Sequence, residues 1–150
     1  MRLFTAAFFM SLIASSNSLH AMPAGTWVGS GNMIILKNGE RMRYPVSYMI
    51  DDAKKTVIAK YGADESGFSL KFEYKHAAKQ MVEIFVEGKP GGIGYCMVSS
   101  CHFDLDFSDS EIGQNRISST FTWNKDQLIV NGHSFTDEFI YEDILARPRN

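Results

Sequence analysis

The residues with the most obvious chemistry are the two cysteines of the chain, Cys96 and Cys101, which four residues separate. Strand-like segments flank Ser99 and Ser100, so the cysteines face each other across a predicted hairpin, close enough for a disulfide. Closing so small a ring stabilises a fold by only about 2 kcal/mol in the chain-entropy model. We predict a disulfide, a bond that is typical of an oxidising compartment.

Two other roles for these cysteines are alternatives to a structural bond. The run from Cys96 to His102 reads Cys-Met-Val-Ser-Ser-Cys-His, a widened relative of the c-type haem attachment motif, in which two residues separate the cysteines. A redox-active disulfide is the other alternative, although thiol-exchange sites use closer cysteines at a helix N-terminus. Because the run lies on a predicted β-hairpin, we expect no cofactor.

His102, Asp104 and Asp106 alternate along one predicted strand, so their side chains point to the same side. Oxygen donors at alternate positions are similar to a calcium loop, but the glycine of the sharp turn and the closing glutamate are missing. We therefore expect a solvated polar face and no metal site. The chain also has no Gly-x-Ser-x-Gly elbow and no recognisable Ser/His/Asp set, so we expect no catalytic residues and no enzyme activity.

Residues 1–21 have the three-part layout of a signal peptide: a basic start at Arg2, an apolar run over residues 3–14, and a small, polar exit ending at Ala21. The apolar run is shorter than the roughly 20 residues that span a bilayer. We expect cleavage after Ala21, with Ser18 as the rival site. Residues 22–150 then form a single domain that is secreted or periplasmic, with no transmembrane segment.

The charge of the chain argues against nucleic acid as a partner. Removing residues 1–21 takes away one of the 15 basic residues and none of the 17 acidic ones, which gives a net charge of −3. Lysine and arginine are scattered along the chain and form no basic stripe that could neutralise phosphates.

Alternating apolar and polar residues recur along the whole chain, and no helix-period segment interrupts them. Short turns such as Asn38-Gly39 join the predicted strands. Residues 75–79 are predicted to form a polar turn or one helical turn, and residues 88–92 a loop. The pattern predicts an all-β fold, an antiparallel up-and-down barrel of about 8–10 strands, with a β-sandwich as the runner-up. Pro45 lacks an N–H and predicts a strand edge or a bulge, which argues against full closure.

Aromatic residues make up 13% of the chain, and many of them fall on the inward faces of the predicted strands. In a small barrel such residues either fill the interior or line a pocket for an apolar ligand, where tyrosine hydroxyls supply the polar contacts. The predicted pocket-lining residues are Trp27, Tyr44, Tyr48, Phe72, Tyr74, Phe121 and Trp123.

The first predicted strand opens with Gly25-Thr26-Trp27, which resembles the Gly-x-Trp at the start of the first barrel strand in lipocalins and, more loosely, in the calycin group. The resemblance implies an antiparallel barrel that holds a small hydrophobic ligand. It also implies that a basic residue near the last strand, here Arg147, packs over Trp27. The long C-terminal helix of lipocalins has no counterpart in this sequence.

Two functions from different classes follow. The first is an exported small β-barrel that binds a small apolar ligand in its interior. The alternative is a ligand-free protein-interaction or inhibitor module of the bacterial envelope, with an envelope protein as its partner. The interior volume separates them, because a ligand site needs a cavity of several hundred Å³ and an interaction module does not.

Overall fold

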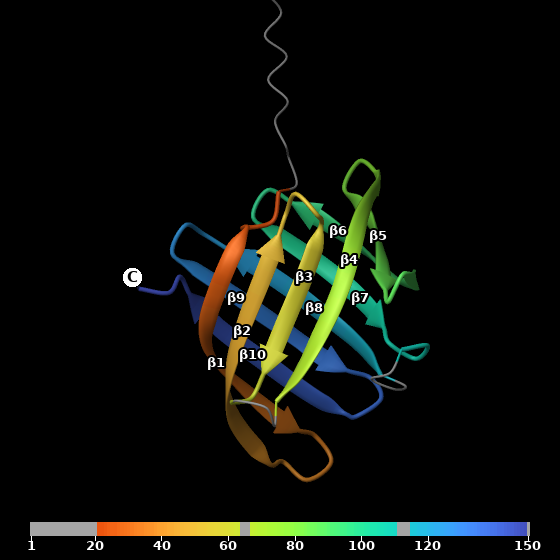
Figure 1. The fold of residues 1–150 in the computed structure, drawn as a ribbon. Helices are drawn as coiled ribbons and strands as arrows, with labels where there is room; N and C mark the ends of the chain where they lie inside the picture. The colour runs from red at the N-terminus through yellow and green to blue at the C-terminus, as the bar shows by residue number, and fades with distance from the viewer. Residues whose placement is uncertain (1–20, 64–66, 111–114, 150) are drawn as a thin grey trace, which may run out of the picture.

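The computed structural model describes residues 21–63, 67–110 and 115–149, so the predicted signal peptide lies outside the described residues except for Ala21. Ten β-strands account for most of the described chain (Figure 1). They are β1 (Gly25–Ile35), β2 (Arg41–Asp51), β3 (Thr56–Tyr61), β4 (Phe68–Ala78), β5 (Met81–Val86), β6 (Lys89–Met97), β7 (Ser100–Asp106), β8 (Arg116–Trp123), β9 (Gln127–Ser134) and β10 (Phe139–Ala146).

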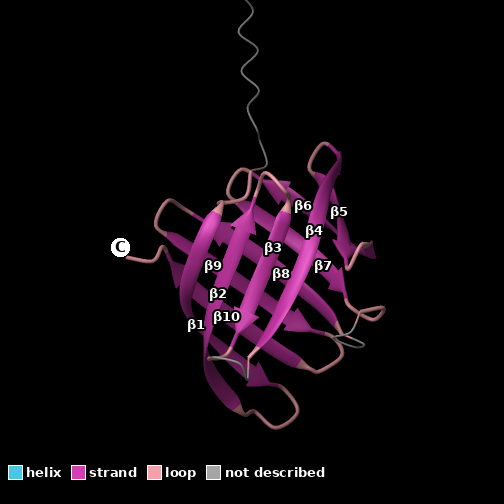
Figure 2. Ribbon diagram, viewed as in Figure 1, coloured by secondary structure: helices cyan, strands magenta, loops and turns pink. Residues whose placement is uncertain are grey.

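The ten strands form one closed antiparallel barrel. Each strand pairs with its neighbours in sequence, and β1 pairs with β10 to close the ring (Figure 2). The predicted all-β fold and the preference for a barrel over a sandwich are confirmed. In the part of the chain that the structure describes, no helix is long and apolar enough to cross a membrane.

Pro45 does not interrupt the barrel, and the expectation that it argues against closure is wrong. Pro45 lies in β2 opposite Ser30 of β1. Its carbonyl accepts a hydrogen bond from the N–H of Gly62 at 2.9 Å, so its backbone polar groups face β3. Since the last paired residue of β3 is Tyr61, the missing N–H falls where the ladder already ends. A proline is tolerated at such a position.

Two predicted connections are strands instead. Residues 75–78 continue β4, and the turn comes at Lys79, whose φ is 50°. Residues 89–92 open β6, and the turn before them uses Glu87 and Gly88, both with positive φ, as tight hairpins require. Gly92 lies within the ladder with a φ of 138°, and a Cβ there would come within 1.9 Å of the backbone oxygen of Asp104. The absence of a side chain at Gly92 therefore lets β6 lie close to β7, and Gly92 is not part of a loop.

The end of the barrel that holds Trp27, here called the Trp27 end, is covered by residues 22–24 and by Arg147. The indole Nε1 of Trp27 donates a hydrogen bond to the carbonyl of Pro23 at 2.8 Å. The guanidinium carbon of Arg147 lies 3.8 Å from the indole ring centroid, and its Nη1 donates to the carbonyl of Ala24 at 2.6 Å. The prediction that Arg147 packs over Trp27 is confirmed.

Candidate functional site

A carboxylate lies inside the barrel towards the end opposite Trp27. Strict alternation along β10 turns Asp143 inward, and its exposed fraction is 0%. The hydroxyl of Tyr44 donates to one carboxylate oxygen at 2.7 Å, and the hydroxyl of Tyr48 donates to the other at 2.8 Å. Because the proton of Tyr48 is used in this way, the hydroxyl of Tyr61 is the donor in the 2.7 Å bond between Tyr61 and Tyr48.

Among the described residues, the hydrogen-bond partners that the structure shows for Asp143 are tyrosine hydroxyls and no basic side chain. Burial raises the pKa of Asp143, against the hydrogen bonds from Tyr44 and Tyr48, which lower it. Burial is also the largest cause of the raised pKa of both tyrosines. Gly31 makes room for the network, since a Cβ there would lie 2.2 Å from Asp143 Oδ1 and 2.3 Å from the Tyr44 ring. The network fixes how the tyrosine rings fill this half of the barrel.

The cavity beside this network is small. It has a volume of about 30 Å³, room for one or two water molecules, whereas pockets for small-molecule ligands hold about 300–1,000 Å³. At its mouth, Phe68 is 56% exposed and stacks on Tyr61 with the ring centroids 4.9 Å apart. The side chains around the cavity are Met33, Tyr44, Tyr61, Phe68, Leu70, Ile117, Phe139 and Tyr141. Side chains therefore fill the barrel interior.

The predicted pocket-lining residues are spread over the whole core. Of these residues, Tyr44 borders the small cavity. Tyr48 and Phe72 pack edge-on against Phe121 and Phe103 respectively, in the middle of the barrel. The others lie at the Trp27 end, where Trp27 and Tyr74 are fully buried and Trp123 is half-buried. Their role in binding a ligand stays a prediction.

Sequence reasoning missed Asp143, Tyr61 and Tyr141. The sequence pattern that could have identified Asp143 is the alternation along β10. It places Asp143 on the same face as Phe139, Tyr141 and Leu145. An acid within an otherwise apolar face is the exception that marks a buried polar network. Tyr141 is hydrogen-bonded to the hydroxyl of Ser119 on β8.

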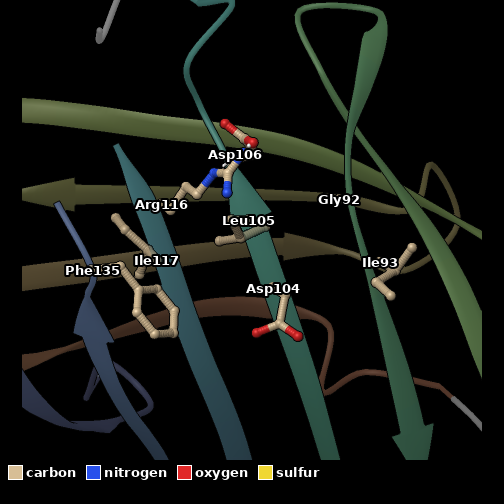
Figure 3. A pocket seen from close by; sticks show the side chains of 8 residues that line it. All are labelled: Gly92, Ile93, Asp104, Leu105, Asp106, Arg116, Ile117 and Phe135. Carbon is tan, nitrogen blue, oxygen red and sulfur yellow. Dashed lines mark hydrogen bonds and ion pairs between the residues drawn. The ribbon is translucent and has the colours of Figure 1, made fainter. Parts of the chain in front are cut away.

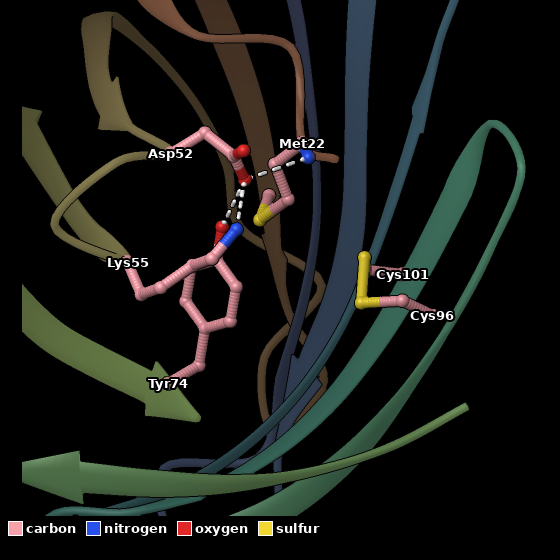
Figure 4. Close-up of a disulfide and its surroundings, with 6 residues drawn as sticks. All are labelled: Met22, Asp52, Lys55, Tyr74, Cys96 and Cys101. Atoms are coloured by element: carbon pink, nitrogen blue, oxygen red, sulfur yellow. Dashed lines mark hydrogen bonds and ion pairs between the residues drawn. A yellow bond between two sulfur atoms is a disulfide. The ribbon is translucent and has the colours of Figure 1, made fainter. Parts of the chain in front are cut away.

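The predicted disulfide is present. Cys96 of β6 and Cys101 of β7 are directly paired, with their Cα atoms 4.1 Å apart, and both are buried (Figure 4). Val98 and Ser99 form the two-residue turn beyond them, and neither has the positive φ of the turns that best match strand twist. The disulfide therefore stabilises a hairpin whose turn residues, Val98 and Ser99, do not themselves favour a tight turn. Val98 at the tip is 76% exposed.

The outer face of β6 in this hairpin is apolar. Ile93, Tyr95 and Met97 alternate along β6 and point outward, and Met81 of β5 pairs with Tyr95. All four are about half exposed. Together with Val98 they form what we call the β6 stripe, a run of exposed apolar side chains along one side of the barrel. Clustering of this kind marks interaction surfaces, whereas single exposed apolar residues are ordinary.

A groove of about 500 Å³ on the outer surface continues the stripe at its Ile93 end (Figure 3). Phe135, which is well exposed, forms an apolar wall on the far side of the groove from Ile93. Between them lie Asp104 and the ion pair of Asp106 with Arg116, at 2.9 Å. The groove thus combines apolar walls with a charged floor.

His102 belongs to the same outer face. Its Nδ1 lies 2.9 Å from Thr120 Oγ1, its Nε2 lies 3.3 Å from Asp104 Oδ1, and its ring stacks on Tyr95. A hydroxyl, an imidazole and a carboxylate in this order are arranged as in nucleophilic catalysis. The arrangement lies on the face of a paired sheet, whose backbone N–H groups bond to neighbouring strands and make no oxyanion hole. The predicted interpretation, a polar face, fits this geometry better.

Comparison with known proteins supports the fold alone. No model of a known protein family matches the sequence, and no curated protein matches it. A solved structure, that of a protein of unknown function from the DUF3598 family of Nostoc punctiforme, is similar with a TM-score of 0.56 at 12% sequence identity. The match covers 84% of this chain and 48% of that protein, so the chain spans about half its length. The molecule is thus a small closed β-barrel, a class compatible with the calycin resemblance.

Proposed function

We propose that this protein is an exported β-barrel that acts through its outer surface, as a protein-interaction module of the bacterial envelope. The observation that carries the proposal is the β6 stripe at the disulfide-braced hairpin. Five apolar side chains are exposed side by side there, while the interior has little free volume. The partner is an envelope protein that offers its own apolar side chains.

The brace between Cys96 and Cys101 supports a binding role for the hairpin tip. Turns are usually built from glycine, asparagine, aspartate and proline. An exposed valine at the tip, such as Val98, neither favours the turn nor hydrogen-bonds to water. A hairpin held rigid before binding loses less conformational entropy when it docks. The disulfide also supports an oxidising compartment, which agrees with the signal peptide predicted at residues 1–21.

Site-specific crosslinking in the envelope tests the proposal. A photoreactive phenylalanine analogue replaces Tyr95 in the stripe or, as a matched control, Met49, which is equally exposed on β2. We expect one crosslinked protein of defined mass from position 95 and none from position 49. The double substitution Ile93→Ser and Met97→Ser should abolish this product and leave the thermal unfolding of the barrel nearly unchanged. The same yield from positions 95 and 49 would contradict the proposal.

A second candidate function, binding of a small apolar ligand, has support from the cavity under Phe68. Its surrounding side chains are almost all apolar at their exposed surfaces, and Tyr44 among them is one of the pocket-lining residues expected from sequence. A ligand larger than one or two non-hydrogen atoms has to displace Phe68, the most exposed side chain at the mouth. In this function Phe68 acts as a movable cover.

Binding of an apolar fluorescent probe distinguishes the two functions. If the barrel binds ligands, Phe68→Ala should increase the affinity for the probe, and Leu70→Phe, which fills the cavity, should abolish binding. The outward substitution Met49→Phe is the control and should have no effect. If the probe neither binds nor raises the melting temperature of any variant, ligand binding at this site is refuted.

A further inference from the structure

Met22 is held at the Trp27 end by a specific contact. Its exposed fraction is 2%, whereas Ala21 before it is exposed. The main-chain nitrogen of Met22 donates a hydrogen bond to Asp52 Oδ1 at 3.1 Å (Figure 4). Asp52 lies in the turn between β2 and β3, 30 residues further along the chain.

Two further hydrogen bonds hold the carboxylate of Asp52 in place. The same Oδ1 accepts hydrogen bonds from Tyr74 Oη at 2.8 Å and from Lys55 Nζ at 3.0 Å. Burial acts to raise the pKa of Asp52, but the hydrogen bonds from Lys55, Tyr74 and Met22 and the positive charge of Lys55 together outweigh it, so the pKa is lowered. Asp52 is therefore a fixed anion that faces the nitrogen of Met22.

We infer that the bond between Ala21 and Met22 is the processing site, and that the α-ammonium group released there forms an ion pair with Asp52. An endopeptidase that removes signal peptides would hydrolyse this bond with one water molecule. The carbon–nitrogen bond breaks, Ala21 takes the hydroxyl, and the nitrogen of Met22 takes the hydrogen. At neutral pH the new amine also binds a proton from solvent, because α-amino groups have a pKa of about 7.7–8.0.

The position of Asp52 favours cleavage after Ala21 over the alternative cleavage after Ser18. Cleavage there would leave residues 19–21 attached, and the nitrogen of Met22 would stay a neutral amide. Cleavage after Ala21 places a positive charge at that nitrogen, where a carboxylate already accepts its hydrogen bond. Charge-assisted hydrogen bonds are roughly twice as strong as neutral ones.

The ion pair would complete the cover of the Trp27 end. Pro23 accepts the indole hydrogen bond of Trp27, and Ala24 accepts that of Arg147. With Met22 bound to Asp52, three successive residues each hold a different part of the barrel. Processing thus adds a positive charge to a segment that already forms part of the fold.

The ionisable groups around the new amine determine its expected behaviour. Asp52 favours the charged amine, and Lys55, which shares the same oxygen, opposes it. Asp51 lies next in sequence and bonds to Lys54 on the exposed side of the turn. Removing the charge of Asp52 should lower the pKa of the α-amino group, and removing that of Asp51 should lower it less.

Two measurements test the inference. The first is the intact mass of the protein recovered from the envelope, which should correspond to a chain beginning at Met22. The second compares melting temperatures of chains beginning at Met22 and at Leu19, each released from a fusion by a site-specific protease. The Met22 chain should melt higher by about 3 °C, the shift expected for roughly one charge-assisted hydrogen bond in a domain of this size.

Substitution at Asp52 makes the test specific to the ion pair. In Asp52→Asn, the two chain lengths should melt at the same temperature, and the pKa of the α-amino group measured by NMR should fall. The matched control Asp51→Asn should keep the difference between the two lengths. A mature chain beginning at Leu19, or a difference that persists in Asp52→Asn, would overturn the inference, because loss of the Tyr74 and Lys55 contacts alone affects both lengths equally.

Discussion

Replacing Trp27 by alanine should cost much of the stability of the barrel. Trp27 is fully buried at the end of the core. Truncation of a buried tryptophan costs about 3–5 kcal/mol through lost burial and the cavity that remains. The variant also loses the hydrogen bond to Pro23 and the stacking of Arg147, which contribute about 1 kcal/mol each.

These contributions overlap, so we expect a total loss of about 4–5 kcal/mol, from a folding free energy of about 5–15 kcal/mol. Urea unfolding followed by far-ultraviolet circular dichroism measures it without relying on tryptophan fluorescence. Trp123→Ala is the matched control, because Trp123 is half-buried and its truncation should cost about 1–2 kcal/mol. Equal losses of unfolding free energy in the two variants would refute the reasoning that Trp27 fills the end of the core.

Three further predictions concern the core. Replacing both Cys96 and Cys101 by alanine should lower the unfolding free energy by about 2 kcal/mol, measured by urea unfolding; an unchanged value would contradict the bracing role. Because burial raises the pKa of Asp143, its folded carboxyl binds a proton at a higher pH than the unfolded one. Wild-type protein should therefore gain stability relative to Asp143→Asn as the pH falls from 7 to 4, measured by calorimetry, and a loss would contradict this sign. Gly31→Ala should destabilise by about 1–3 kcal/mol through overpacking against Tyr44, and a neutral result in thermal unfolding would show that the network yields.

The fold could be predicted from sequence because each strand carries its own signal. The alternation in residues 68–74 and the Asn38-Gly39 turn are local features, and ten such segments joined by short turns leave few architectures. Arg147 could be placed over Trp27 only through the resemblance to lipocalins. Nothing in the spacing of two residues 120 positions apart implies contact.

The errors have a common physical cause. The glycines in residues 88–92 and the lysines and alanines in residues 75–79 have low intrinsic strand propensity, so the local pattern assigns these segments to turns. In the folded chain, neighbouring strands determine the outcome, since Gly92 is needed where the backbone of Asp104 comes close. Pro45 was misjudged for the same reason, because the missing N–H matters only if a partner strand is there to accept it.

The candidate sites were harder to predict than the fold. Most of the aromatic residues predicted to point inward are buried, but whether such residues fill a barrel or surround a cavity depends on volumes that one strand cannot reveal. Asp143 was overlooked because a charged residue is assigned outward by default. The β6 stripe was not identified although residues 93–98 were predicted as a strand, because both faces of this segment carry apolar or small residues and the pattern does not show which face points outward.

The pairing of β1 with β10 distinguishes one seam of the barrel from the nine hairpins that make up the rest. Every other pairing joins neighbours in sequence, so each loop that must close is short, whereas the seam closes a loop of over a hundred residues. The seam should therefore form last during folding. Ala24 and Arg147 lie beside it at the Trp27 end, where the guanidinium of Arg147 donates to the carbonyl of Ala24. A circular permutant that joins residue 149 to Met22 by a short linker and opens at the Asn38-Gly39 turn should keep the fold and move the last pairing to form from β1–β10 to β1–β2.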